Sequence, residues 1–277
     1  MNRLFYDPET RKVSLNHLTS LAIIDEQKSG ESVQEFIQRI DDKDDRRFKL
    51  DFHDNVVLGK QMLESNVYRG VVLEGIPATY AETCEIINNI PVTSGLKPDE
   101  INQIVSLKRA WEFLLDKENL LAFPQALDFD LIRMIHGIVG SNMESLKPNQ
   151  VGELRKVPIF VGGVKAHDFG IPDQGEIVDD LGVLNELEDP VVRALEAFLY
   201  LCKKQMFRDG NKRTANLTAN FFLVQNASGL LSVRDELVPD FKMLLIDWYD
   251  RGNKIDIMNF LLNKCYIYNY VGKAFLD

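Results

Sequence analysis

Two apolar stretches with a polar break between them constrain the fold of this chain most. The stretches VVRALEAFLYLC (191–202) and LTANFFLV (217–224) both read as buried helices. The break between them, QMFRDGNKRTAN (205–216), holds a glycine, an aspartate, two asparagines and an adjacent lysine and arginine. Such residues are common in ordinary turns. Here, however, the break lies next to the core of the domain, which favours a binding loop.

The break has the composition of an anion site. If the second helix starts near Asn211, its unpaired N–H groups and its dipole favour negative charge at the loop. Gly210 permits a close backbone approach or a positive φ, and Lys212 and Arg213 add two positive charges. Asp209 adds a carboxylate, which suits a Mg²⁺ ion that bridges phosphate oxygens. The sequence therefore predicts a nucleotide-phosphate site, although the P-loop pattern GxxxxGK[ST] is absent.

Helical spacing of apolar residues dominates the chain from residue 55 onward. We expect one helix over NVVLGKQMLESNVYRG that ends at Gly70, a short helix over ATYAETCEIINNI with Thr79 or Thr83 near its start, and a helix that opens at Pro98. The segment VGELRKVPIFVGG (151–163) breaks this rhythm with β-branched residues followed by two glycines, which is typical of a β-hairpin or an extended flap. The expected fold is mainly α with one hairpin.

The expected organisation is a small N-terminal appendage before a helical domain. Residues 1–55 are rich in charge of both signs and differ in character from the remainder of the chain. We assign residues 1–55 to the appendage and 56–277 to the helical domain, with a core at about 120–235 and C-terminal helices over 236–277.

Composition narrows the classes of partner and compartment. The net charge of −10 and the pI of about 5.0 make the chain a poor general nucleic-acid binder. No apolar run reaches the length of a membrane span. Cys84, Cys202 and Cys265 are odd in number and widely spaced, which favours thiols in a reducing compartment. We therefore expect a soluble cytoplasmic protein.

The loop resembles the signature loop of Fic domain proteins, His-x-Phe-x-Asp/Glu-Gly-Asn-Gly-Arg-x-x-Arg. The matching positions are Phe207, Asp209, Gly210, Asn211 and Arg213, and the lysine at position 212 is similar to the Doc branch. The order of other pieces adds to the resemblance: VYRGVVLEGIPATYAET, INQIVSLKRAWEFLL, LIRMIHGIVG and VGELRKVPIFVGG. It covers roughly residues 66–231 and implies a Fic-type helical bundle with a β-hairpin flap.

The resemblance also implies a function, because Fic proteins mostly transfer AMP from ATP to a hydroxyl of a target protein. It implies that Asp209 binds the metal, that Gly210, Asn211 and Lys212 contact the nucleotide phosphates, and that Arg213 holds the β and γ phosphates. It further implies a flap that aligns a protein target by strand pairing, formed by Val157, Pro158, Ile159, Phe160 and Val161.

Three positions depart from the family pattern. Gln205 replaces the histidine that acts as general base, and an amide cannot take a proton near neutral pH. Asn216 replaces the second arginine of the pattern. Glu74 and Gly75 fit the end of the family's inhibitory motif and would be regulatory, but its Ser/Thr position holds Gly70.

Three other side chains are candidates for the missing base. Cys202 lies one helical turn before the loop, His167 follows the flap, and His136 lies on a helix. Each also has a simpler interpretation, as a buried small residue, a surface loop residue and a packing or capping residue, respectively.

These observations leave three functional hypotheses. The first is an adenylyltransferase-like enzyme that binds ATP with Mg²⁺ and has weakened or altered activity. The second is a pseudoenzyme that binds a nucleotide and acts as a regulatory or interaction module. The third is a Doc-like kinase or another phosphate-transfer enzyme.

Overall fold

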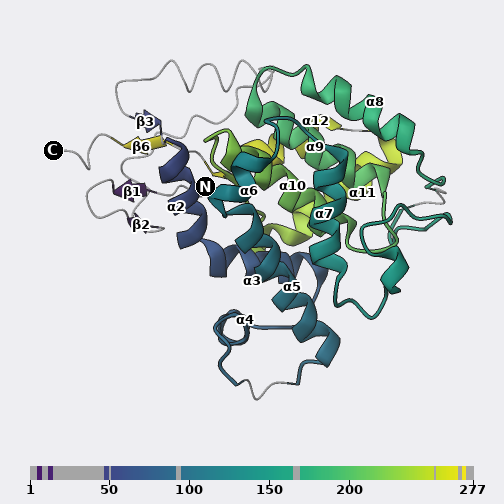
Figure 1. Cartoon of the computed structure of the whole chain (residues 1–277), viewed down its shortest axis with the longest axis horizontal. Helices are drawn as coiled ribbons and strands as arrows, with labels where there is room; N and C mark the ends of the chain where they lie inside the picture. The colour runs from purple at the N-terminus through teal and green to yellow at the C-terminus, as the bar shows by residue number, and fades with distance from the viewer. Residues whose placement is uncertain are drawn as a thin grey trace.

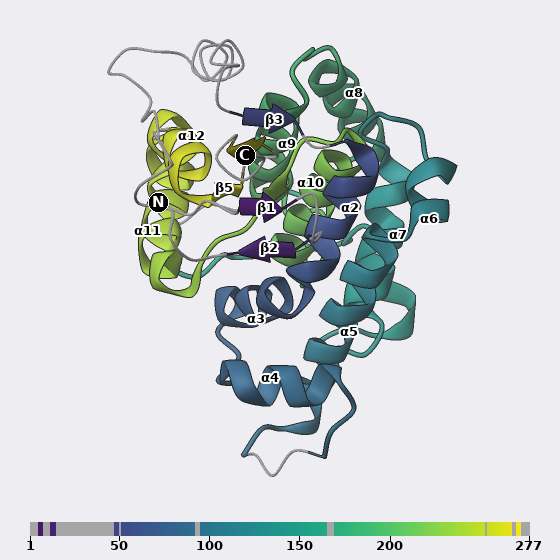
Figure 2. The same cartoon turned by 90° about the vertical axis from the view of Figure 1, so that its left-hand side faces the viewer.

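The computed structural model describes residues 51–91, 95–164, 169–252 and 254–267, together with the backbone of four short strands at 5–7, 12–14, 47–49 and 270–272. Figures 1 and 2 show a helical body, with β1, β2, β3 and β6 lying together on one side of it. The mainly α class expected from the sequence is confirmed.

Helices make up most of the described chain. In chain order, the helices and helical turns are α2 (Phe52–Gln61), α3 (Leu63–Glu74), α4 (Tyr80–Ile87), α5 (Pro98–Leu114), α6 (Lys117–Ala122), α7 (Phe129–Gly140), η2 (Pro148–Gln150), α8 (Gln174–Asn185), α9 (Pro190–Lys204), α10 (Asn211–Gln225), η3 (Asp235–Leu237), α11 (Val238–Arg251), α12 (Lys254–Phe260) and η4 (Leu261–Cys265).

The strands pair antiparallel in twos. The pairs are β1 (Phe5–Asp7) with β2 (Lys12–Ser14), β3 (Arg47–Lys49) with β6 (Tyr270–Gly272), and β4 (Leu230–Leu231) with β5 (Tyr266–Ile267). The second pair joins the N-terminal part of the chain to its C-terminal part. The boundary assigned at residues 55 and 56 stays a prediction.

Local signals explain several helix ends. Thr79 and Glu82 form a capping box at the start of α4, and Pro98 occupies the first turn of α5. The prediction that a helix ends at Gly70 is wrong: α2 and α3 meet at Met62, and α3 continues to Glu74. A Cβ at position 70 would lie 3.4 Å from Leu107, an ordinary contact distance, and Gly70 occupies a regular position inside α3.

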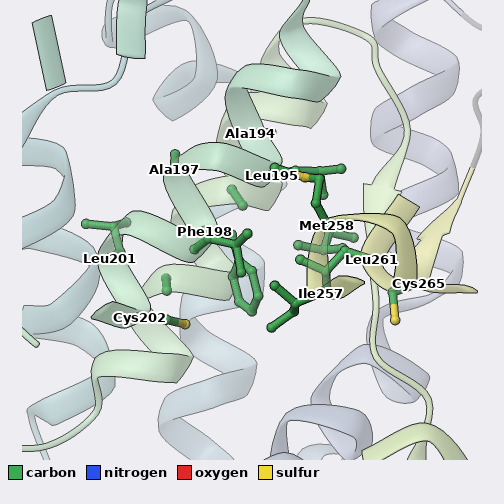
Figure 3. Close-up of a cluster of buried hydrophobic side chains, with 14 of the residues drawn as sticks. Ala194, Leu195, Ala197, Phe198, Leu201, Cys202, Ile257, Met258, Leu261 and Cys265 are labelled. Atoms are coloured by element: carbon green, nitrogen blue, oxygen red, sulfur yellow. The ribbon is translucent and has the colours of Figure 1, made fainter. Parts of the chain in front are cut away.

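The central element is α10, which lies between two hydrophobic clusters. Its Ala219 and Phe222 pack into the cluster formed with α9, α11 and α12, whereas Leu217 and Phe221 pack into the cluster formed with α2, α3, α5 and α7. Figure 3 shows part of the first cluster, where side chains of α9 meet those of α12 and η4. The body of α10, from Ala215 onward, is therefore packed on both sides.

Buried amide side chains fix the loop that follows α10. The Asn55 side chain accepts a hydrogen bond from the N–H of Gly229 (2.7 Å) and donates one to its carbonyl oxygen (3.3 Å). Gly229 has φ +77°, and a Cβ there would lie 2.1 Å from the carbonyl oxygen of Ile267. Only glycine fits this position.

The expected flap is extended rather than a regular hairpin. In the described part of residues 151–172, one antiparallel bridge joins Ile159 to Phe169. Val157 and Phe160 are exposed, with 44% and 81% of their surfaces accessible. The flap therefore presents apolar side chains outward.

Within the described residues, no helix is long and apolar enough to cross a bilayer.

Candidate functional site

The helix α9 ends in a left-handed residue at the position of the family's histidine. Gln205 has φ +49° and ψ +56°, which is uncommon for a residue other than glycine. Its side-chain amide donates a hydrogen bond to the carbonyl oxygen of Cys202 (2.6 Å). The hydroxyl of Tyr249, from α11, donates to the same oxygen (2.7 Å). The Gln205 side chain is therefore turned back toward its own helix.

The turn between α9 and α10 is closed by Asn211. Its side-chain oxygen accepts a hydrogen bond from the N–H of Phe207 (2.8 Å), and its side-chain nitrogen donates to the Phe207 carbonyl (2.7 Å). The side chain of Asn211 is thus engaged in the turn, and what this residue offers a ligand is its backbone N–H. Gly210 has φ +78°, which explains the glycine in the loop.

His136, on α7, packs against the loop and forms a hydrogen bond with it. Its ring stacks on Phe207 with centroids 3.7 Å apart and an interplanar angle of 6°. Its Nδ1 accepts a hydrogen bond from the N–H of Gly152 (2.9 Å), so Nε2 carries the proton and donates to the carbonyl of Asp209 (3.0 Å). Burial lowers the pKa of His136 to about 4, so the ring is neutral near pH 7.

The carboxylate of Asp209 is held at the rim of the turn. Oδ1 accepts a hydrogen bond from the N–H of Gly210 (2.6 Å), and Oδ2 accepts one from the hydroxyl of Ser145 (2.7 Å). The guanidinium of Arg213 lies 3.5 Å from Oδ1. The side chain of Asp209 is still 41% exposed, so it remains accessible to a ligand.

The two cations of the loop face the end of α3. Lys212 Nζ and Arg213 Nε lie 3.7 and 3.8 Å from Oε2 of Glu74. Arg213 also donates a hydrogen bond to the side-chain oxygen of Gln103 (2.7 Å). Oε1 of Glu74 is buried without a hydrogen-bond partner. Glu74 thus lies beside both cations, and its contacts with them are longer than hydrogen bonds.

A cavity of about 790 Å³ opens beside this loop. Its wall combines the end of α3, the flap, the loop and α11: Glu74, Pro158, Ile159, Phe160, Val161, Gly162, Gln205, Arg208, Asp209, Gly210, Asn211, Lys212, Lys242, Leu245, Ile246 and Tyr249. The volume is in the range of small-molecule sites. An apolar side between the flap and α11 and a polar side at the loop suit a ligand with a flat apolar end and an anionic end.

Arg155 ties the flap to the loop. The residue is 4% exposed, and its guanidinium donates hydrogen bonds to the carbonyls of Gln205 (2.6 Å), Val157 (2.7 Å) and Gly170 (2.5 Å). Its backbone N–H donates to the carbonyl of Met206 (3.0 Å). One buried side chain therefore connects the position of the family's base with both sides of the flap.

Most of the residues expected at the site lie together. The loop residues, Glu74 and four of the five flap residues border one cavity; Val157 is not among its lining residues, Gly75 is the left-handed C-cap of α3, and Arg213 is buried behind the wall.

Two of the three side chains considered as replacements for the missing general base are poorly placed to accept a proton. Cys202 is fully buried, which raises its pKa to about 12, and both ring nitrogens of His136 are engaged. His167 lies outside the described residues.

Sequence reasoning missed several residues around the loop. Ser145, Gln103 and Tyr249 have no local signal because they reach the loop from other elements. Arg155 has no distinguishing signal either, since Lys156 also precedes the same apolar segment.

Comparison with known proteins identifies the segment that carries this loop. The sequence model of the Fic/DOC family matches residues 126–223. Protein adenylyltransferase fic-1 of Caenorhabditis briggsae is 28% identical over 167 residues, which cover 58% of this chain and 31% of the relative. Protein adenylyltransferase Fic of Aedes aegypti is 25% identical over 236 residues, covering 77% and 44%. The chain thus spans 31% and 44% of the lengths of these two relatives, less than half of each.

Solved structures agree on the fold. Fic-1 from C. elegans aligns with a TM-score of 0.58 and 22% identity, over 74% of this chain and 60% of that one. A Fic domain containing signaling protein from Bacteroides thetaiotaomicron aligns with a TM-score of 0.60 and 18% identity, over 74% and 83%. At these identities the likeness concerns the fold alone. Residues 126–223, which include the loop between α9 and α10, thus match the Fic/DOC family model, and the chain shares the fold of these solved Fic proteins.

Proposed function

We propose that the cavity binds ATP together with Mg²⁺, and that the chain is an adenylyltransferase-like protein whose chemistry does not use a base at position 205. The observation that carries this proposal is the first turn of α10, which borders a cavity of about 790 Å³ and is flanked by Lys212. Backbone N–H groups at a helix start, next to a lysine, form a site for phosphate oxygens.

The residues present fit a magnesium ion that is shared with phosphate. Asp209 offers an exposed carboxylate, and Mg²⁺ is usually held by one or two carboxylates plus phosphate oxygens and water. In the described part of the chain, no three His, Cys, Asp or Glu side chains could hold a metal by themselves. A metal at Asp209 would therefore depend on the nucleotide, where it would neutralise phosphate charge.

The contacts of Gln205 favour a second candidate, a nucleotide-binding module without transfer activity. Its amide is directed to the Cys202 carbonyl, so it neither accepts a proton nor points freely into the cavity. Loss of a general base commonly lowers a rate by about 10²–10⁴-fold. Positioning and electrostatics can still support some transfer without it.

Calorimetric titration with ATP and MgCl₂ tests the site. We expect binding by the wild-type protein, and affinity about tenfold weaker in Lys212→Gln, since a hydrogen bond to a charged group contributes roughly 1.5–3 kcal/mol. Lys108→Gln is the matched control. Lys108 is similarly exposed and also sits beside a glutamate, but it lies on α5 and does not line the cavity. No heat of binding, or equal affinity in both variants, would refute the proposed site.

Labelled ATP separates the candidate activities. Label transferred from the α phosphate to a protein indicates adenylyl transfer, whereas label transferred only from the γ phosphate indicates a kinase. Binding without transfer of either label indicates the nucleotide-binding module.

A further inference from the structure

Two cations on the cavity wall have no hydrogen-bond or ion-pair partner among the described residues. Arg208 is exposed and Lys242, on α11, is half-buried; both line the cavity. Neither makes a hydrogen bond or an ion pair with any other residue that the structure describes. By contrast, Lys212 faces Glu74, and Arg213 contacts Glu74, Asp209 and Gln103. The cavity therefore has positive charge beyond that balanced by its own carboxylates, in a chain whose net charge is −10.

The same wall offers no described imidazole or thiol that could take a proton from an acceptor. The Tyr249 hydroxyl donates its hydrogen to the Cys202 carbonyl, and burial raises its pKa further above the neutral range. Asp209 already accepts two hydrogen bonds, and Glu74 lies beside two cations. A hydroxyl acceptor would arrive with its proton attached, whereas an acceptor that is already ionised would need no base.

We propose that the acceptor of this site is a carboxylate of a protein target, held by Arg208 and Lys242 next to the nucleotide. A side-chain carboxylate is ionised at neutral pH, because its ordinary pKa is about 4. Arginine grips a carboxylate through two parallel N–H donors, and a lysine adds a second point charge. The inference rests on the proposed function for its transfer step, but the carboxylate site itself can exist without it.

The transfer step then balances without a proton. A carboxylate oxygen attacks the α phosphorus of ATP and forms a new O–P bond. The bond between that phosphorus and the oxygen bridging to the β phosphate breaks, and pyrophosphate leaves with the electron pair. The product is a mixed carboxylic–phosphoric anhydride with AMP on the target.

Peptide binding without nucleotide tests the carboxylate site. The probes are a short, labelled glutamate-containing peptide and its glutamine twin, titrated by fluorescence anisotropy against wild type, Arg208→Gln/Lys242→Gln and the control Lys203→Gln. Lys203 is exposed on α9 and stacks over Trp248 outside this cavity. We expect the glutamate peptide to bind wild type and the control, and to bind the double variant about tenfold more weakly. Equal binding of both peptides would overturn the site.

ATP titration of the same variants separates this inference from the proposed function. We expect the double variant to lose less ATP affinity than Lys212→Gln does. If it loses as much, Arg208 and Lys242 belong to the triphosphate site and the inference is wrong. If wild type binds no ATP, the proposed function fails, and the peptide arm still decides whether a carboxylate site exists.

Trapping tests the transfer step. With ATP and MgCl₂, the glutamate peptide should release pyrophosphate, and added hydroxylamine should convert the anhydride to a peptide hydroxamate and free AMP. Transfer of AMP to a serine peptide but not to the glutamate peptide would overturn the assigned acceptor class.

Discussion

Replacement of Arg155 by methionine tests whether one side chain holds the flap to the signature loop. Methionine keeps an aliphatic stem and removes the guanidinium, so the carbonyls of Gln205, Val157 and Gly170 lose a charged donor. Three bonds of about 1.5–3 kcal/mol give a gross loss of roughly 4.5–9 kcal/mol. Because the wild-type arginine also carries a dehydration cost of several kcal/mol, we expect a net loss of about 3 kcal/mol.

Thermal and denaturant unfolding measure this loss. At roughly 2–4 °C per kcal/mol for a chain near this size, the Tm should fall by about 6–12 °C. Hydrogen exchange should accelerate in the segments around residues 157, 170 and 205, where the bonds end. Arg251→Met is the control, because Arg251 is 78% exposed and, among the described residues, pairs only with Asp247 on its own helix; its effect should stay below about 0.5 kcal/mol. An equally small loss of stability in Arg155→Met, with unchanged hydrogen exchange, would refute the conclusion that Arg155 holds the flap to the loop.

Three further predictions concern particular contacts. Gly229→Ala should destabilise the fold by about 3 kcal/mol or more in denaturant unfolding, because its Cβ would clash with the Ile267 carbonyl and φ is positive; a loss below about 1 kcal/mol would contradict this. His136 is neutral when folded, but the unfolded chain takes up its proton below about pH 6.5, so its contribution is complete above pH 6.5 and is lost as the pH falls toward 4. This pH dependence, worth about 3 kcal/mol, should be missing from unfolding curves of His136→Gln measured across that range. Gln205→His should raise the rate of AMP transfer to a hydroxyl peptide by about 10²-fold or more if the site lacks only a base. Transfer of label from ATP to the peptide measures this rate, and an unchanged rate would show that the site is incomplete in other ways.

The loop and its helices could be predicted because their signals are local. The apolar flanks indicate α9 and α10, Gly210 marks the positive φ, and Lys212 lies next to the turn in sequence and in space. Helix starts at Thr79 and Pro98 also depend on neighbouring residues, and both are confirmed.

The rest of the site could not be predicted because it depends on contacts between distant segments. Gly70 reads as a helix end, but α3 continues past it to Glu74, with Leu107 of α5 packed beside it. Lys242 and Tyr249 reach the cavity from α11, and no local pattern indicates which face of that helix turns toward the loop. Asn211 is expected at phosphate, but its side chain closes the turn, a choice that propensity alone does not decide.

The position of α10 between two hydrophobic clusters has a consequence for ligand capture. The residues that follow its first turn pack into both clusters, so the start of the helix, which lines the cavity at Asn211 and Lys212, continues from a rigid segment before any ligand binds. An incoming phosphate would meet donors already in place and would lose little affinity to ordering the protein. By the same reasoning, a core substitution in this helix, far from the cavity, should lower the affinity for phosphate because it makes the backbone amides of the first turn more mobile.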